Sequence, residues 1–303
     1  MKRAASGVSG STLMLALWAL VLLSAVVFAW VRSLDRDIDA MNAANRAMEA
    51  RALAHSGITV ALHPNITRAS PHLQARYERN RSYRVTIQSE GGRLNLNYFL
   101  AGGDPAKIAF LKDYLAQSGL TIHEREVFLD NLRDWVSPAG GTRLRNGVAE
   151  SPAYQPAHRP LQSLDEIRRI AGSAPFVSRP HWQDGLTLFS TGPLDLESVP
   201  ADLLALIPGV GEQRARRFVK LREERERAGG DRAGYPFENV AEAIGILGLS
   251  EEQGVQLSGF LGFRDPVVRI RSIGQSENVI RQTDAIVSKA LGASAQILYW
   301  NEK

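Results

Sequence analysis

The sequence lacks cysteine altogether, which excludes disulfide bonds, thiolate metal sites and thiol catalysis. It also lacks the common enzyme signatures, since no nucleophile elbow, phosphate-binding loop or dinucleotide fingerprint is present. Histidine is scarce, and its six positions do not have the spacing of zinc ligands: His55, His63, His72, His123, His158 and His181. Nothing in the sequence indicates an enzyme or a catalytic residue, and we expect stability to come from packing or from bound ligands.

A strong charge imbalance is absent too. The 36 basic and 32 acidic residues give a formal net charge of +4, which is too small to predict a polyanionic partner by itself. The hydrophobic content of 44% and the charged content of 22% are those of a packed globular protein rather than a disordered chain. At 303 residues the chain is long enough for one large or two ordinary domains.

One segment lacks charge completely. Residues 13–31 are mostly Leu, Val and Ala, and as a helix they would span about 28 Å, close to the hydrocarbon thickness of a bilayer. Lys2 and Arg3 precede this segment and the first acidic residue is Asp35, so the positive-inside rule predicts a cytoplasmic N-terminus and an exported remainder. The alternative is a secretory signal cleaved after Ala29, but the apolar segment exceeds the roughly 7–15 apolar residues of a signal peptide.

The apolar segment continues without a helix breaker into a second helical segment. Residues 35–62 contain no proline and one glycine, and Pro64 follows them. Small and apolar residues recur there at three- or four-residue steps and form one stripe of a helix: Ala40, Ala43, Ala47, Ala50, Ala54, Ile58 and Ala61. The two segments together predict one rod about 75 Å long. A secreted protein does not need such a rod, which favours a retained anchor.

Beyond Pro64 the periodicity predicts strands, then helices, then strands. Residues 64–81 indicate a connecting loop, residues 83–88 alternate as a strand, and residues 93–97 could pair with it as a hairpin. Residues 138–160 predict a long loop. The expected helical segments are 104–118, 124–136, 163–172, 194–221 and 239–262, and the expected later strands are 267–271, 278–287 and 295–300. This order predicts an α+β fold in which a helical block is inserted between strands.

The sharpest short motif is Ile207-Pro208-Gly209-Val210-Gly211, which is typical of a helix-hairpin-helix. Gly209 and Gly211 permit a tight turn, and the amides that begin the next helix could hold a phosphate. The basic residues that follow favour nucleic-acid binding: Arg214, Arg216, Arg217 and Lys220. The alternative is a hairpin that only packs helices, its charge offset by Glu212, Glu223, Glu224 and Glu226. Beyond a membrane anchor we favour the packing interpretation.

Carboxylates near the long loop form a candidate cation site. Asp130 and Asp134 are four residues apart on one predicted helix, and Glu150 lies across the following loop. Calcium is bound by clustered oxygen ligands on such loops. The alternative is that these residues are solvated helix-face charges near Arg133, and the spacing alone favours that interpretation.

The N-terminal pattern resembles a type IV-pilin-like prepilin: basic residues, Gly10, and an apolar segment that continues as a long helix. The resemblance implies that a prepilin peptidase cuts between Gly10 and Ser11. Most pilin-like subunits carry a glutamate five residues into the mature chain, whereas that position here is Leu15. In a filament this carboxylate compensates the terminal amine of a neighbour, so an apolar residue is what a subunit at the tip would have.

Within that family the chain resembles the K-type minor pseudopilins of type II secretion systems. The stretches that carry the resemblance are residues 13–18, 54–62, 92–97 and 132–135, then Glu150, Tyr154, residues 163–167, the hairpin at 208–211 and the three-strand tail. The family usually places further aspartates after its Asp-Trp pair as part of a calcium site. Residues 137–141 contain no carboxylate here, so only Asp134 and Glu150 remain and full calcium affinity is not expected.

The resemblance implies a subunit that is a single-pass protein of the bacterial inner membrane with its folded part in the periplasm. It would sit at the pseudopilus tip and begin assembly with the I and J minor pseudopilins, its helix 40–62 contacting partner helices. The rival is an exported helix-hairpin-helix DNA receptor. The predicted divisions are a leader (1–10), a pilin helix (11–62), the start of a pilin-like domain (63–97), an inserted helical domain related to helix-hairpin-helix and SAM-like folds (98–262), and C-terminal strands (263–303).

Overall fold

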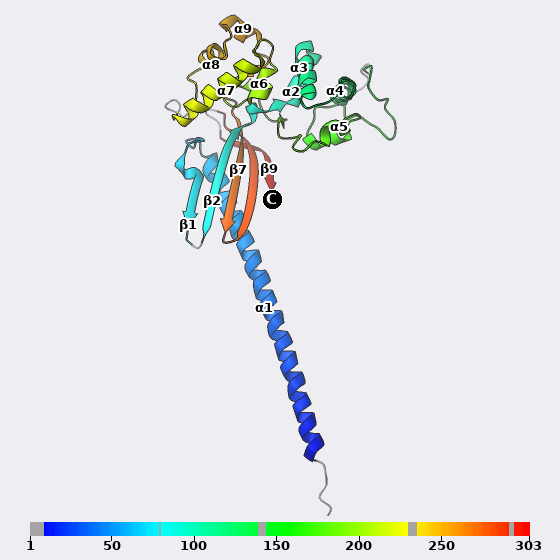
Figure 1. The fold of residues 1–303 in the computed structure, drawn as a ribbon, viewed down its shortest axis with the longest axis vertical. Helices are drawn as coiled ribbons and strands as arrows, with labels where there is room; N and C mark the ends of the chain where they lie inside the picture. Colours follow the sequence, from blue (N-terminus) through cyan, green and yellow to red (C-terminus); the bar gives the residue numbers. More distant parts are fainter. Residues whose placement is uncertain (1–8, 79, 139–143, 230–234, 291–293) are drawn as a thin grey trace, which may run out of the picture.

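The computed structural model describes residues 9–78, 80–138, 144–229, 235–290 and 294–303. A long helix, α1 (Ser9–Leu62), leads into a sheet, and a helical block lies at the end of the sheet farthest from the start of α1 (Figure 1). The fold is of the α+β class, with a small antiparallel sheet and a mostly helical segment between its strands, as predicted.

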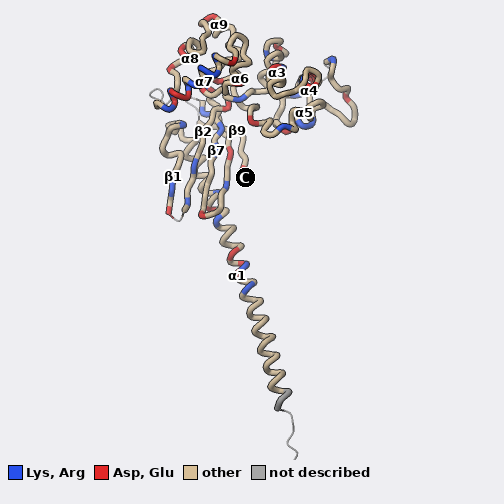
Figure 2. The backbone as a smooth tube through the Cα atoms, viewed as in Figure 1, with Lys and Arg blue, Asp and Glu red and all other residues tan. Residues whose placement is uncertain are grey.

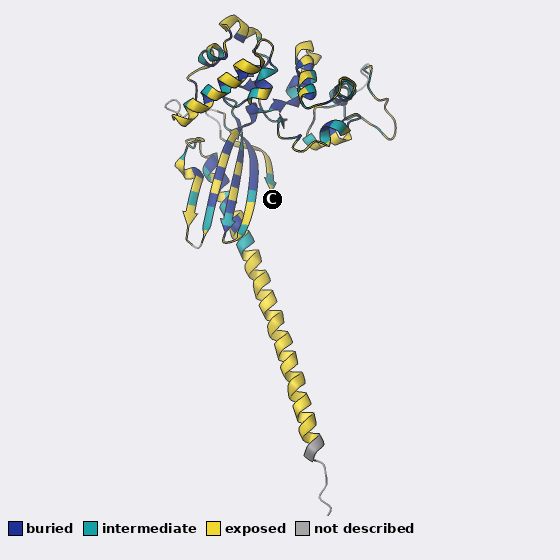
Figure 3. Ribbon diagram, in the orientation of Figure 1, coloured by how far each residue is buried: buried dark blue, intermediate teal, exposed yellow. Residues whose placement is uncertain are grey.

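Helix α1 has two parts with different surroundings. Its first part is uncharged (Figure 2) and exposed (Figure 3), and among the described residues α1 alone is long and apolar enough to cross a membrane. Its last part packs on the sheet, where Ala50, Ala54, Ile58 and Ala61 are buried. The side chains must be small because the backbones approach closely, and a Cβ on Gly274 would clash with the Ala54 amide nitrogen. Our expectation that Ala54 contacts partner helices is therefore wrong.

Five antiparallel strands form the sheet in the order β1-β2-β7-β8-β9. Their bounds are Gln74–Tyr77, Arg81–Ser89, Val267–Ser276, Val279–Ser288 and Gln296–Glu302, and the 3₁₀ helix η1 (Pro71–Leu73) precedes β1. Alternate residues face α1 and form a small apolar core with it, which includes Val85, Ile87, Ile270, Ala285 and Val287. The last three strands lie where the sequence predicts them.

The hairpin predicted for residues 83–88 and 93–97 is wrong. Strand β2 pairs instead with β1, which lies inside the predicted loop, and with β7. The chain turns away from the sheet at Glu90, whose buried carboxylate accepts hydrogen bonds from Arg93 at 2.8 Å and from Arg269 at 2.6 Å. These bonds hold a 3₁₀ turn where a tight hairpin turn was expected.

The helical block contains short helices and two pairs of two-residue parallel strands, β3 with β4 and β5 with β6. Its elements are η2 (Glu90–Gly92), β3 (Leu94–Asn95), α2 (Leu96–Leu100), η3 (Ala101–Gly103), α3 (Pro105–Gln117), α4 (Ile122–Val136), η4 (Leu164–Arg169), α5 (Ala174–Val177), β4 (Leu186–Thr187), β5 (Leu194–Asp195), α6 (Ala201–Ala205), α7 (Gly211–Arg227), α8 (Val240–Leu247), α9 (Glu251–Gln256) and β6 (Leu261–Gly262). One core fills the block, and its largest fully buried side chains are Phe99, Phe128, Phe218 and Phe237.

Candidate functional site

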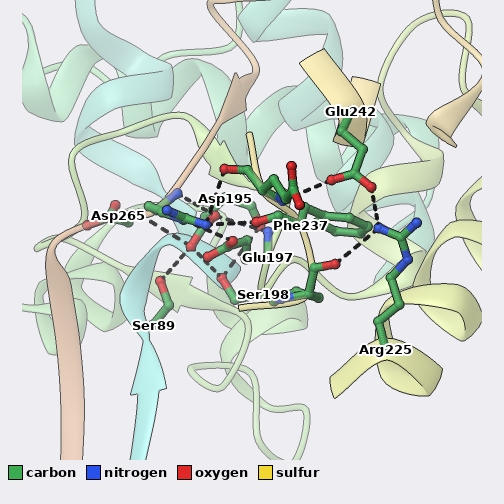
Figure 4. A network of polar contacts seen from close by, with 11 residues as sticks. Ser89, Asp195, Glu197, Ser198, Arg225, Phe237, Glu242 and Asp265 are labelled. Carbon is green, nitrogen blue, oxygen red and sulfur yellow. Dashed lines mark hydrogen bonds and ion pairs between the residues drawn. The ribbon is translucent and has the colours of Figure 1, made fainter. Parts of the chain in front are cut away.

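A buried polar network joins the sheet to the helical block (Figure 4). Its centre is Asp195 on β5, whose side chain is buried. Its Oδ2 accepts hydrogen bonds from the hydroxyls of Ser89 and Ser198, each at 3.0 Å. Its Oδ1 accepts from the amides of Glu197 at 3.0 Å and Arg264 at 3.1 Å. One carboxylate thus connects the end of β2, the loop after β5 and the segment before β7.

Two further acids lie beside this centre. Glu197 accepts a hydrogen bond from Nε of Arg264 at 3.2 Å, and the same guanidinium donates to the Phe237 carbonyl oxygen at 2.7 Å. Burial, followed by the charge of Asp195, raises the pKa of Glu197 to about 7. Burial also raises the pKa of Asp265. The chain itself supplies donors to these carboxylates, so the network orients the block on the sheet.

The predicted helical hairpin is formed by α6 and α7. Its turn contains Pro208, Gly209 and Gly211, and the two glycines have φ values of 82° and 72°. That is the left-handed region, which glycine adopts without the steric cost of a Cβ. The backbone of the motif is therefore as the sequence predicts.

The basic residues of α7 largely bind the protein itself. Arg214 donates hydrogen bonds of 3.2 Å to two backbone carbonyl oxygens. One is that of Gly209, between α6 and α7, and the other is that of Gly248, between α8 and α9. Arg222 is buried and donates to two backbone carbonyl oxygens. Glu212 lies in the first turn of α7 and pairs with the arginine one turn later. Its carboxylate stands where a phosphate would approach the helix, which weakens an anion site.

A second hairpin joins α8 to α9, which the sequence predicted as two short helices without a motif. Gly248 ends α8 in the left-handed region with a φ of 80°, and Ser250 with Gln253 forms a capping box on α9. A glycine followed by a capping-box pair was the signal available in the sequence. The first turn of α9 carries Glu251 and Glu252. Both hairpins therefore present carboxylates at the start of their second helix.

The residues proposed as cation ligands lie at the loop after α4. That loop runs back along α4, and three side chains of the helix accept its amide hydrogens: Asp134 from Leu144 at 3.4 Å, Asp130 from Asn146 at 3.2 Å, and Asn131 from Val148 at 2.7 Å. Asp130 also accepts from the Asn146 side chain at 2.8 Å. The helix thus holds the loop directly.

Glu150 has a different partner, because its Oε1 lies 3.0 Å from Nε2 of His158. The described residues contain no group of three or more His, Asp or Glu side chains that could hold a metal ion. Calcium takes six to eight oxygen ligands, whereas Asp134 and Glu150 are each bonded to neighbours within the chain. Asp134 and Glu150 alone therefore do not make up such a ligand set, and calcium binding stays a prediction to be tested. Residues 139–143, in the middle of the loop, lie outside the described residues.

The predicted prepilin features lie at the start of the chain. The backbone of Gly10 and Ser11 is helical, but the Ser11 side chain and residues 1–8 lie outside the described part of the chain. Leu15 is 68% exposed on the membrane part of α1. Cleavage between Gly10 and Ser11 stays a prediction, as does the role of Leu15.

Comparisons with known proteins bear on both parts of the molecule. A family model described as type II secretion system, protein K, matches residues 92–179. No curated protein matches the sequence. A chain in the crystal structure of the GspK-GspI-GspJ complex from the type 2 secretion system of enterotoxigenic Escherichia coli is similar, with a TM-score of 0.60 and 14% sequence identity. The match covers 89% of this chain and 99% of that chain, and at such identity it is a likeness of fold.

A long N-terminal helix packed on a small antiparallel sheet, with a helical block between the strands, defines a pilin-like protein. Residues 92–179, the first part of that block, carry the protein K domain. This match and the likeness of fold agree with the resemblance to K-type minor pseudopilins found in the sequence.

Proposed function

We propose that this chain is a minor pseudopilin that occupies the tip of the type II secretion pseudopilus and helps to begin its assembly with the I and J minor pseudopilins. Helix α1 would anchor it in the inner membrane with the sheet and block in the periplasm. The observation that supports the tip position is the helical block, which covers the end of the sheet farthest from the membrane segment (Figure 1). Subunits with parallel helices stack along that direction, and the block fills the space that the next subunit would need.

Leu15 supports the same position. An acid within the membrane segment is costly unless it is paired, and the pairing group in pilin-like filaments is the terminal amine of a neighbouring subunit. A subunit with no neighbour above it gains nothing from that acid. The apolar side chain of Leu15 avoids the cost.

We also propose that residues 98–262 act as one inserted domain. The block has a hydrophobic core of its own, which is distinct from the small core between α1 and the sheet. A segment with its own core can be carried between two strands without altering how those strands pair.

The alternative function, an exported DNA receptor, rests on the hairpins and on the basic residues of α7. Glu212, Glu251 and Glu252 oppose a phosphate at the helix starts, and Arg214 is used to join the two hairpins. These observations favour a packing role for the hairpins.

Co-purification of the full-length chain with I and J pseudopilins from membranes tests the proposed function. Stable recovery of the three proteins together supports it, and mass spectrometry should find Ser11 as the first residue. A soluble product that begins at Trp30 would instead establish a secretory signal. Failure to recover either partner under conditions that keep the chain folded would contradict the assignment.

A further inference from the structure

The face of the sheet opposite α1, here named the outer face, is open to solvent along β2. Val85 and Ile87 point toward α1 and belong to the small core beneath it. Successive side chains of a strand point to opposite faces, so the residues between and beside them lie on the outer face. Arg84, Thr86 and Gln88 are all exposed. The outer face of β2 is therefore accessible to another molecule.

Four arginines run diagonally across the outer face and are here named the arginine diagonal: Arg76 on β1, Arg84 on β2, and Arg271 and Arg269 on β7. Arg84 lies opposite Gln74, two residues from Arg76, and Thr86 lies opposite Arg271. Each arginine is thus the diagonal or same-strand neighbour of the next, within reach of long side chains. Basic positions along these three strands are visible in Figure 2.

The chain neutralises only half of the arginine diagonal. Its two members on β7 donate hydrogen bonds to carboxylates, one to Glu90 at 2.6 Å and the other to Asp284 at 2.8 Å. Within the part of the chain that the structure describes, Arg76 and Arg84 have neither an ion pair nor a side-chain hydrogen bond, and both are exposed. Glu78, the next acid along the chain, pairs with neither of them. Two guanidinium groups are therefore available to a ligand.

Protection of the sheet edge explains one of these two arginines. Charged side chains on an edge strand discourage pairing with other chains, and β1 is an edge strand of four residues. Arg76 can serve that purpose. Arg84 lies on β2, which is paired on both sides, so its charge protects no edge. Binding of an acidic ligand accounts for both.

The two free arginines line a hollow of about 740 Å³ on the outer face. Its lining comes from four strands, β1, β2, β7 and β8, and includes Ile273 and Ile280, which are 36% and 57% exposed. The hollow lies at the end of the sheet nearer the membrane segment, where Arg81 pairs with Glu49 of α1 at 3.2 Å. It combines two free positive charges with an apolar surface, and it lies beside the sheet, away from the helical block.

We propose that this hollow binds an acidic segment of another protein, with two carboxylates on Arg76 and Arg84. A guanidinium binds a carboxylate through two parallel hydrogen bonds, which makes arginine selective for such groups. Apolar side chains of the same segment would cover Ile273 and Ile280, and this part of the hollow favours a protein segment over a bare anion. The inference goes beyond the proposed function and does not depend on the tip position.

The first test measures binding of a short fluorescent peptide of alternating glutamate and leucine to the full-length chain in detergent. We expect binding that weakens as salt is added. A peptide of alternating glutamine and leucine should bind at least about tenfold more weakly, because it lacks the charges. No binding of the first peptide at about 1 mM would overturn the inference. Equal competition by inorganic phosphate would show a simple anion site and overturn the choice of a protein segment.

Charge reversal locates the site of peptide binding. We expect Arg76→Glu and Arg84→Glu each to weaken binding about tenfold or more, and Arg84→Lys, which keeps the charge but loses the paired hydrogen bonds, to weaken it less. Arg169→Glu makes the same change at an exposed arginine of the helical block and should leave binding unchanged. Equal losses in Arg84→Glu and Arg169→Glu would mean that net charge alone attracts the peptide, which contradicts the proposed site.

The second test identifies the natural partner by a photoreactive amino acid at Gln275, which lines the hollow. Cross-linking is done in cells that carry the full-length chain in its own membrane. We expect an adduct on a segment with at least two acids, lost in the double variant Arg76→Glu with Arg84→Glu. Lysines in place of those acids should restore the adduct in the double variant. An adduct on a segment without acids, or one that survives the charge reversal, would overturn the inference.

The outcomes for this site and for the proposed function are separate. Loss of co-purification with the I and J pseudopilins in the unmodified chain would overturn the proposed function and leave peptide binding at the hollow standing. Absence of peptide binding would overturn the hollow as a site and leave the proposed function standing.

Discussion

Glu197 is buried between a carboxylate and a guanidinium, and that environment sets its protonation. Burial and the charge of Asp195 raise its pKa from 4.5 to about 7, so the folded state holds a proton that the unfolded chain would release. The resulting contribution to the free energy of unfolding is complete below about pH 4.5 and is lost as the pH rises through about 7.

We therefore expect the free energy of unfolding to fall between pH 5 and pH 8, by at most about 3 kcal/mol through Glu197. Glu197→Gln keeps an acceptor for Arg264 but cannot titrate, so the free energy of unfolding of this variant should fall less between pH 5 and pH 8. Urea denaturation of the detergent-solubilised chain, followed by tryptophan fluorescence, measures the difference. Glu238→Gln changes an exposed acid nearby and should behave like the unmodified chain. An unchanged pH dependence in Glu197→Gln would contradict the assigned pKa.

Asn131 is completely buried on α4, and its side chain both donates a hydrogen bond to the following loop and accepts one from it. Its amide donates to the Asn146 carbonyl oxygen at 3.2 Å, and its Oδ1 accepts from the Val148 amide at 2.7 Å. Asn131→Ala leaves these groups unsatisfied and should reduce stability by about 2 kcal/mol, whereas Asp130→Ala on the more exposed side should cost less.

Calcium removal should have no effect on the same loop, because helix side chains hold it directly. We expect the thermal midpoint of the purified chain to be the same in calcium and in EDTA. A calcium-dependent rise in the midpoint that Asp134→Ala abolishes would show that the two carboxylates, with residues 139–143, do bind the ion.

Among the helices and strands, the sequence predicts best those whose ends are marked by residues close to them in the chain. Asp104 and Pro105 begin α3 and Gly119 follows its end, as their capping preferences indicate. The two-residue strands had no such signal, because Leu94 pairs with Leu186 far along the chain. A helix was expected from residue 163, but η4 is a 3₁₀ helix, and the Glu166 carboxylate binds Arg159 and Trp135 instead of completing a capping box.

The sequence did not predict the buried polar network around Asp195 for a related reason. Asp195 and its partner Ser89 are 106 residues apart, and no local pattern connects them. Residues 194–221 were expected to be helical, but Leu194 and Asp195 form the short strand β5 and the first helix of this stretch begins only at Ala201. Residues 194–197 are all buried, and Asp195 bonds Ser89 at the end of β2, where the sheet meets the helical block.

The hairpin elements yield a prediction about nucleic acid. Arg214 and Arg222 bind backbone carbonyl oxygens of the chain, so fewer basic side chains of α7 are left for phosphates, with Arg217 and Lys220 among the exposed ones. We expect the purified chain to bind duplex DNA more weakly than about 10 μM at physiological salt, with steep salt dependence. Fluorescence anisotropy measures this. Tighter binding that Gly209→Val with Arg217→Ala abolishes would favour the DNA-receptor function instead.

At the scale of the whole molecule, the apolar start of α1 and the helical block lie at opposite ends of the fold. The membrane segment and the exposed face of α1 resemble those of a subunit that packs among other helices, whereas the opposite end is closed by the helical block (Figure 1). Under the proposed function, the helical block leaves room for neighbouring subunits below and beside this one but not above it. Its position in a fibre should therefore be terminal.

The number of copies per fibre tests this position. Quantitative mass spectrometry of sheared pseudopili should find this chain as a rare component, and its amount should stay constant while fibre length varies. Leu15→Glu should impair pseudopilus assembly, because a tip subunit has no amine above it to pair with the buried acid, whereas Leu15→Ile should be tolerated. If the chain repeats along the fibre in proportion to length, or if Leu15→Glu increases its incorporation, it is a wall subunit and the tip assignment is wrong.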